Sequence, residues 1–197
     1  MPTLASSMNR RQTICTLAAL GATTNPLMNA QATLTPNLAP AAAPQEVAAA
    51  LKAVQLLGRA PLRFFGLLVY EARLWTTAKF DAARYELSPF ALELEYARKL
   101  EGAAIAERSI AEMRRVDKFS EAQAQKWLAL MTQAFPNVGA QDRITGVNDG
   151  AGGVRFYFNG KETGAIQDQA YARLFFGIWL SEKTSSPALR SALINQA

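Results

Sequence analysis

Two absences limit the chemistry open to this chain. It contains no histidine, and its single cysteine, Cys15, lies close to the N-terminus. Ser–His and Cys–His nucleophilic pairs and the usual zinc sites need these residues, so those classes of site are excluded. Any catalysis would have to use carboxylates, arginine, lysine, tyrosine or hydroxyl groups. We expect no metal, no cofactor and no structural disulfide.

Carboxylates are therefore the first residues to place. Glu93 and Glu95 are two positions apart in an alternating segment, so both project from one face of a predicted strand. Such a pair can serve acid–base catalysis, but a solvated charged face is the simpler interpretation and the one we expect. Glu112 lies in a predicted helix, where it shares one face with Ile105 and Ser109.

The charge of the chain is mildly basic. It carries 21 Lys and Arg against 16 Asp and Glu, a formal net charge of +5. Without Arg10 and Arg11, which belong to the expected leader, 19 basic and 16 acidic residues remain, a net charge of +3. Most basic residues are scattered singly, whereas a nucleic-acid site gathers them on one face. We expect no nucleic-acid partner.

Residues 1–32 have the order of a secretory signal peptide. An arginine pair precedes a short apolar run at 14–20, and small residues follow, with Ala30 and Ala32 in an A-x-A arrangement. We expect cleavage after Ala32 and a periplasmic or secreted protein, and Met8 offers an alternative start. The arginine pair also fits the twin-arginine route, so Sec and twin-arginine export both stay open.

The remaining chain divides into a linker and one domain. Residues 33–45 hold three prolines and no charge, which predicts a flexible linker. Residues 46–197 are enough for one domain with a sizeable core. No stretch after residue 35 reaches the roughly 18 to 20 unbroken apolar residues of a membrane span. We therefore expect a soluble mature domain without an integral membrane span.

The order of the predicted elements is strands, helices, strands, helices. Alternating or apolar segments punctuated by glycine and proline predict two or three strands within 54–75 and one at 90–96. Later strands are predicted at 142–147 and 154–158, and helices at 45–52, 102–116, 120–134, 167–180 and after Pro187. Trp75, Trp127 and Trp179 are expected in the core. This order indicates an α+β domain, an antiparallel sheet with helices packed on one face.

Four segments in this order resemble the chalcone isomerase-like family, in particular exported bacterial proteins with this domain. The matching segments include the Val-Tyr strand and the late Ile-Trp-Leu helix, and together they span about residues 50–195; they are Leu57–Arg59 with Arg63–Trp75, Pro89–Tyr96, Gly102–Arg115, and Tyr171–Leu180 with Ser186-Pro187. The resemblance implies the open-faced β-sandwich of that family, with a ligand cleft between sheet and helices.

The resemblance also implies that chalcone ring closure is lost. In the plant enzymes a Thr from an early strand, and a Tyr and an Asn from the first helix, contact the substrate. Alignment places Phe65, Ile105 and Glu112 at these three positions. A buried polar network does not keep its chemistry through such changes. Glu112 would then either act as a general base or, as we favour, form a salt bridge with a neighbouring arginine.

The cleft arginine of the family has two candidates in this chain. Arg59 fits because it follows a glycine, and Arg63 fits by its distance to the strand. In non-catalytic relatives that hold fatty acids, such an arginine pairs with the ligand carboxylate; a surface position for either arginine is the simpler alternative. With Tyr70, which we expect to pack rather than to catalyse, these residues complete the candidate binding site; its members are Arg59, Arg63, Phe65, Tyr70, Ile105, Ser109 and Glu112.

Three functions remain open at this point. The first is a non-catalytic protein that binds a fatty acid or a similar small apolar carboxylate, and it requires an apolar cavity with an arginine at its mouth. The second is an isomerase or lyase, which requires Glu112 and an arginine to converge on an open pocket. The third is a structural or partner-binding protein, which a cavity plugged by Phe65 and Ile105 would favour.

Overall fold

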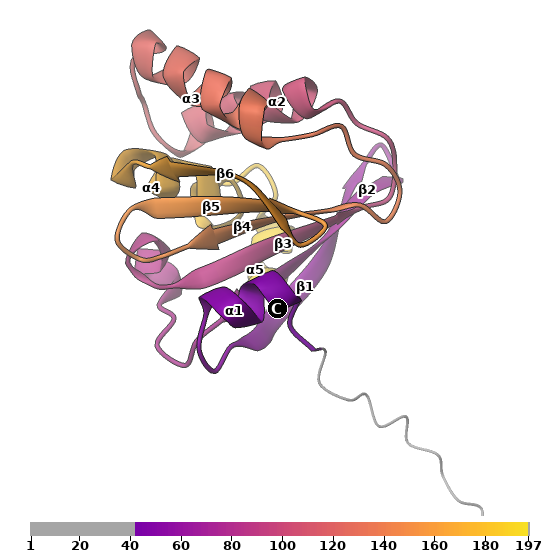
Figure 1. Ribbon diagram of the computed structural model, residues 1–197, viewed down its shortest axis with the longest axis vertical. Coiled ribbons are helices and arrows are strands. Elements are labelled where there is room, and N and C mark those ends of the chain that lie inside the picture. The colour runs from indigo at the N-terminus through magenta and orange to yellow at the C-terminus, as the bar shows by residue number, and fades with distance from the viewer. Residues whose placement is uncertain (1–41, 197) are drawn as a thin grey trace, which may run out of the picture. The chain divides into compact units, whose positions relative to one another are not determined.

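The computed structural model describes residues 42–196. The expected signal peptide, its cleavage point and most of the expected linker lie outside the described residues. The described chain forms one six-stranded antiparallel sheet in which every strand pairs with its sequence neighbours, in the order β1-β2-β3-β4-β5-β6 (Figure 1). The strands are β1 Gln55–Phe64, β2 Leu67–Thr76, β3 Phe90–Tyr96, β4 Arg143–Asn148, β5 Gly153–Phe158 and β6 Lys161–Gln167.

Five α-helices and a 3₁₀ helix complete the described domain. They are α1 Gln45–Ala50, η1 Ala82–Leu87, α2 Gly102–Val116, α3 Glu121–Ala134, α4 Gln169–Leu180 and α5 Pro187–Leu193. The expected capping box starts α3, because Ser120 and Gln123 exchange side-chain and backbone hydrogen bonds. Asp168 caps α4 through the backbone N–H of Tyr171.

Alternation along the strands gives the sheet two different faces. One, the inner face, carries residues such as Leu74, Leu92 and Phe156, which pack under α2, α4 and α5 in the main core. The other, the outer face, is covered in part by α1, whose Val47 packs with Trp75 and Tyr157 in a second, smaller cluster. Figure 1 shows α1 on the opposite side of the sheet from α2 and α3.

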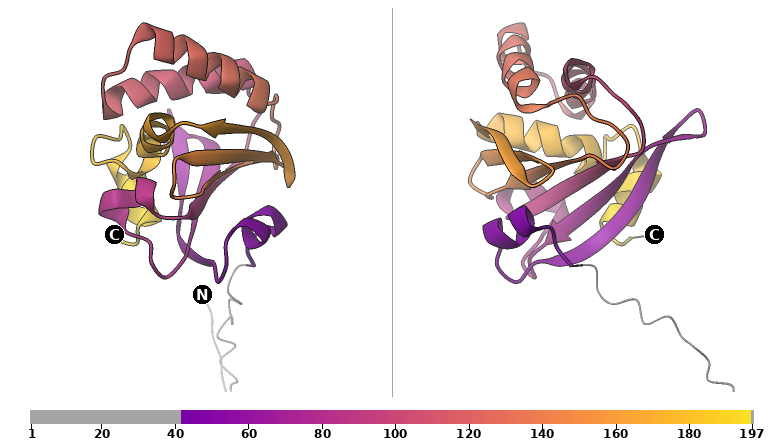
Figure 2. Two further views of the ribbon diagram at one scale, coloured as in Figure 1. Left: turned by 60° about the vertical axis from the view of Figure 1, so that its left-hand side comes forward. Right: turned by 45° about the vertical axis from the view of Figure 1, so that its right-hand side comes forward.

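The β1–β2 hairpin ends in an unusual turn. Phe65 and Gly66 connect the strands, and both have positive φ, 47° and 78°, as a two-residue type I′ turn requires. Near the tip the register shifts, because Leu62 pairs with Tyr70 while Arg63 pairs with Leu68, which leaves Val69 unpaired. Such a bulge bends the strand and changes the direction of the side chains beside it. The hairpin extends past its neighbours in the right-hand view of Figure 2.

Most of the predicted elements are present, and two expectations need correction. The strand β6 was not predicted, because Lys161–Gln167 is polar and carries only one deeply buried residue, Ile166. The expected solvated face at Glu93 and Glu95 is wrong at Glu93, whose side chain is 2% exposed. The three tryptophans are buried as expected. Among residues 42–196, no helix is long and apolar enough to cross a membrane.

Candidate functional site

A pocket of about 590 Å³ opens between the inner face of the sheet and the helices α2, α4 and α5. Its walls are mainly aliphatic and aromatic, and its polar groups are three arginines, one carboxylate and a few hydroxyls. The lining residues are Leu62, Arg63, Phe64, Val69, Tyr70, Leu94, Tyr96, Arg98, Leu100, Ala104, Ile105, Arg108, Ser109, Glu112, Phe135, Ile144, Phe175, Ile178, Trp179, Ser185, Ser186 and Leu189.

The bulge in the β1–β2 hairpin explains how neighbouring residues reach the same pocket. In a regular strand Leu62 and Arg63 would point to opposite faces, yet both line the pocket, as do Val69 and Tyr70. The unpaired Val69 lies at the register shift, and its carbonyl accepts a hydrogen bond of 2.9 Å from Ala97. The irregular hairpin thus brings an arginine to the mouth of an otherwise apolar pocket.

Two tyrosines and a tryptophan form the aromatic part of the wall. Trp179 Nε1 donates a hydrogen bond of 2.9 Å to the Tyr70 hydroxyl, and the Tyr70 and Tyr96 rings meet edge to face, 5.8 Å between centroids. Burial raises the pKa of Tyr70, and the charge of Glu112 adds to this effect. The phenol therefore stays protonated at neutral pH. Among the described residues, no acceptor takes the proton of the Tyr70 hydroxyl, which makes that proton available to a ligand.

Glu112 is held in an ion-pair cluster at the wall of the pocket. Its carboxylate lies 2.6 Å from Arg108 Nη2 and 3.5 Å from Arg115 Nε, while its own side chain is 8% exposed. The spacings are i−4 and i+3, so both partners come from the same helix face. This is the salt bridge that we favoured over a general base. The Ser109 hydroxyl is also engaged, because it donates to the carbonyl of Ile105 at 2.8 Å.

Five of the seven residues predicted for the site line this pocket: Arg63, Tyr70, Ile105, Ser109 and Glu112. Phe65 does not, because it occupies the hairpin turn with 91% of its surface exposed. The alignment treated it as a strand residue, but the chain reverses there. Arg59 is also outside the pocket, since it is paired with Arg73 across the hairpin, and directly paired residues share a face.

The sequence reasoning missed several residues of the pocket. Arg108 was detectable, because it stands four residues before Glu112 on a predicted helix, a spacing that favours a salt bridge. Arg98 stands two residues after the end of β3 and reaches the pocket from an irregular turn, for which the sequence holds no signal. Trp179 was expected only in the core, yet it forms part of both core and pocket wall, as does Tyr96.

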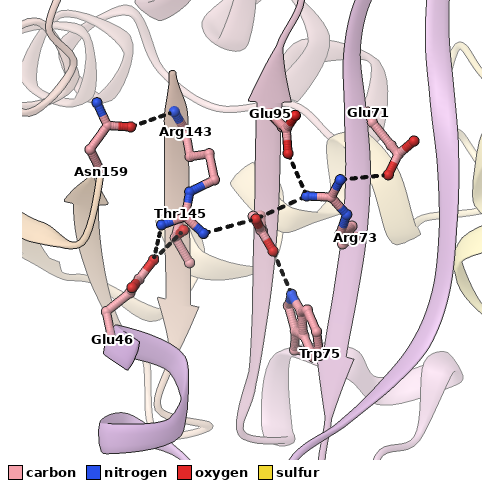
Figure 3. Close-up of polar contacts among 9 residues, drawn as sticks. Glu46, Glu71, Arg73, Trp75, Glu95, Arg143, Thr145 and Asn159 are labelled. Carbon is pink, nitrogen blue, oxygen red and sulfur yellow. Dashed lines mark hydrogen bonds and ion pairs between the residues drawn. The ribbon is translucent and has the colours of Figure 1, made fainter. Parts of the chain in front are cut away.

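The outer face carries a polar network of a different kind (Figure 3). Buried Glu93 accepts hydrogen bonds from Trp75 Nε1 at 2.8 Å, Arg73 at 3.1 Å and Arg143 at 3.2 Å. Arg73 also contacts Glu71 and Glu95, at 2.7 and 2.8 Å. Every charged group in this network therefore has at least one partner of opposite charge.

The same network fastens α1 to the sheet. Glu46, in the first turn of α1, accepts a hydrogen bond of 3.1 Å from Thr145 and lies 3.8 Å from Arg143 Nη2. Within residues 42–196, no cluster of three or more histidine, cysteine or acidic residues could hold a metal ion.

The pocket can accommodate an amphipathic anion. Its volume lies in the range of roughly 300 to 1,000 Å³ that is usual for small-molecule sites, and its apolar walls favour a hydrocarbon body. Arg63 and Arg98 line it, and neither has an ion-pair partner among residues 42–196. An arginine without a partner can bind a carboxylate in bidentate geometry.

Comparison with known proteins agrees with the predicted fold. The model of the chalcone isomerase-like family matches residues 36–195. Among solved structures, a fatty-acid binding protein of Arabidopsis thaliana is similar with a TM-score of 0.57 and 14% sequence identity, over 73% of this chain and 88% of that chain. At this identity the likeness concerns the fold. No curated protein matches the chain.

Proposed function

The chain belongs to the chalcone isomerase-like family, and we propose that it is a non-catalytic member that binds a fatty acid or a similar apolar carboxylate in the pocket of the inner face. The observation that carries this proposal is a mainly apolar pocket lined by Arg63, which has no acidic partner among residues 42–196. A fatty-acid binding protein of the same fold supports the ligand class.

The hydrocarbon chain supplies most of the affinity in this proposal. Each methylene group moved from water into the pocket contributes about 0.8 kcal/mol. The side chains of Ile105, Ile144 and Phe175 offer the apolar surface that such a chain needs. Neither Phe65 nor Ile105 fills the pocket, which argues against a purely structural role.

The carboxylate of the ligand would fix the orientation of the ligand in the pocket. Arg63 lies in an exposed part of β1, where, among residues 42–196, its Nη1 donates only to the carbonyl of Gly66, at 3.2 Å. This leaves further N–H groups free to bind a carboxylate at the mouth. The Tyr70 hydroxyl offers a donor deeper in the pocket. The Glu112 carboxylate would repel a ligand anion, which places the ligand head group at the Arg63 side.

An isomerase is the second candidate, and one observation favours it. Glu112 and Arg108 converge on an open pocket, as that function requires. Against it, both carboxylate oxygens of Glu112 are already engaged in ion pairs, one with Arg108 and the other with Arg115.

Export is part of the proposal for the intact protein. The order of charged, apolar and small residues at 1–32 supports a periplasmic or secreted location, by Sec or twin-arginine export. A bound fatty acid would then be held outside the cytoplasm. Cell fractionation tests this point, and recovery of the protein in the cytoplasm with residues 1–32 intact would contradict it.

Ligand binding can be tested with two arginine variants of one strand. Arg63→Ala removes the proposed carboxylate partner, whereas Arg59→Ala removes the same charge four residues earlier on the other face. We expect Arg63→Ala to weaken binding of a fluorescent long-chain fatty acid by about tenfold or more, as for loss of a charge-assisted hydrogen bond of roughly 1.5 to 3 kcal/mol. Arg59→Ala should bind like the wild type. Equal affinities for all three proteins would contradict the role of Arg63.

A further inference from the structure

The β1–β2 hairpin tip exposes an unusual amount of apolar surface. Phe64, Phe65, Leu67 and Leu68 are 60%, 91%, 56% and 37% exposed, and Leu87, on η1, is the one other large apolar side chain exposed in residues 42–196. The two phenylalanine rings meet edge to face, 4.5 Å between centroids. Apolar side chains gathered at one projecting point mark an interaction surface.

Phe65 lies at a turn position whose backbone geometry does not favour a phenylalanine. A type I′ turn prefers Asn or Asp before Gly, because both central residues need positive φ. Phe65 adopts φ 47° in this position, which is rare for a bulky side chain. Its ring contacts solvent instead of the core, so packing does not explain it. A residue that breaks a local rule without a structural gain indicates a function at that position.

Three cations lie close to the hairpin tip. Arg63 lies within it, and Arg98 and Lys99 lie in the adjoining turn, which is tied to the hairpin by the hydrogen bond from Ala97 to the Val69 carbonyl. These three side chains are exposed and have no ion-pair partner within the described part of the chain. Even with Glu101 counted, segments 62–69 and 97–101 carry three positive charges and one negative, a net charge of +2.

We propose that the hairpin tip inserts into the surface of an anionic lipid bilayer, and that the pocket exchanges its ligand there. Apolar side chains ringed by Lys and Arg match the acyl boundary and the anionic head groups of such a surface. The second half of this inference rests on the proposed function: Leu62, Arg63 and Phe64 belong to both hairpin and pocket, so a bilayer at the tip lies at the mouth of the pocket.

A second copy of the chain fits the same surface less well. A two-fold contact through the tips would bring like charges together, because each copy carries the same cations around the same apolar centre. Strand addition to the edge of β1 is opposed by Pro61, which has no backbone N–H to offer.

The test compares Phe65→Asn with Leu87→Asn in protein purified from its own host. Phe65→Asn creates the preferred Asn-Gly turn, so it should melt at or above the wild-type temperature. Leu87→Asn removes a similarly exposed apolar side chain elsewhere. In flotation with phosphatidylcholine vesicles that contain phosphatidylglycerol, we expect Phe65→Asn to lower the partition coefficient by about tenfold. Leu87→Asn should bind as the wild type does, and added salt should weaken all binding.

Two results would overturn the inference. One is a wild-type protein that stays unbound with the anionic vesicles, and the other is equal loss of binding in both variants. A dimer that Phe65→Asn dissociates, without vesicle binding, would assign the tip to a second copy instead. Titration of a fatty acid in the absence of vesicles separates this inference from the proposed function. Binding of the acid without vesicle binding contradicts the docking surface and leaves the proposed ligand standing. Vesicle binding without binding of the acid contradicts the proposed ligand, and with it the exchange at the bilayer, but leaves the docking surface standing.

Discussion

The two faces of the sheet are built from alternate residues of the same strands, yet they use polar groups in different ways. On the outer face, Glu93 has three hydrogen-bond donors around it and Arg73 contacts three carboxylates. On the inner face, Arg63 lines an apolar pocket with no acidic partner in the described chain. Polar groups that satisfy one another hold structure, whereas unsatisfied ones at a cavity are available to a ligand.

The outer network gives the largest expected effect on stability. Glu93→Ala would leave Arg73, Arg143 and Trp75 Nε1 without their buried acceptor, and removal of one partner from a buried ion pair costs about 3 to 5 kcal/mol. We expect a loss of that size in the free energy of unfolding, measured by urea denaturation. Fatty-acid affinity of the folded fraction should be unchanged. A loss below about 1 kcal/mol would show that the outer network is not a structural element.

The buried tyrosines on the inner side of the sheet should make the protein less stable at alkaline pH. Burial raises the pKa of Tyr70 and Tyr96 above the ordinary value of 10.0, and it raises the pKa of Tyr85 to about 12. Because the pKa of each tyrosine is higher in the folded than in the unfolded chain, the tyrosines contribute fully to stability below pH 10, where they are protonated in both states. It is lost as the pH rises, because the unfolded chain releases its protons first.

Tyr70→Phe isolates one of these groups. The free energy of unfolding should fall between about pH 10 and 12, and the fall should be less steep in Tyr70→Phe by about 1.4 kcal/mol per pH unit. At pH 8 the variant should be less stable than the wild type by about 1 kcal/mol, because Trp179 Nε1 loses its acceptor. Parallel pH profiles for the two proteins would contradict the burial of the Tyr70 hydroxyl.

The smallest expected effect is a change in fatty-acid affinity on substitution of Glu112, and it distinguishes a binding site from an isomerase site. Glu112→Gln removes the negative charge from the pocket wall and releases Arg108. If the pocket only binds a carboxylate, affinity should rise by a few fold, on the order of 1 kcal/mol, because a repulsive charge is lost. If the pocket is an isomerase site, turnover should disappear instead. Weaker fatty-acid binding by a stable Glu112→Gln protein would contradict the position assigned to the ligand head group.

The sequence predicted the inner face better than the outer one. Helical spacing placed Ile105, Ser109 and Glu112 on one face, and that face lines the pocket, because α-helix geometry is set locally. The ion network could not be predicted, since it joins α1, β2, β3 and β4, and the partners of Glu93 are 18, 20 and 50 residues away. Only the register of the sheet brings them together.

The hairpin shows a second limit of sequence reasoning. Alignment with the family places Phe65 at a strand position, and the turn signal of Gly66 alone did not fix where the chain reverses. The bulge that brings Arg63 to the pocket mouth depends on one unpaired residue, Val69. That irregularity decides between Arg59 and Arg63 for the pocket, and no local pattern in the chain specifies it.

Native mass spectrometry of the protein purified from its own host tests the central claim most directly, when the bound material is extracted and identified. We expect one fatty acid, or a similar apolar carboxylate, per chain, retained in Arg59→Ala and depleted in Arg63→Ala. A protein that carries no such ligand, and whose melting temperature does not change with any of a panel of fatty acids, would contradict fatty-acid binding in this pocket.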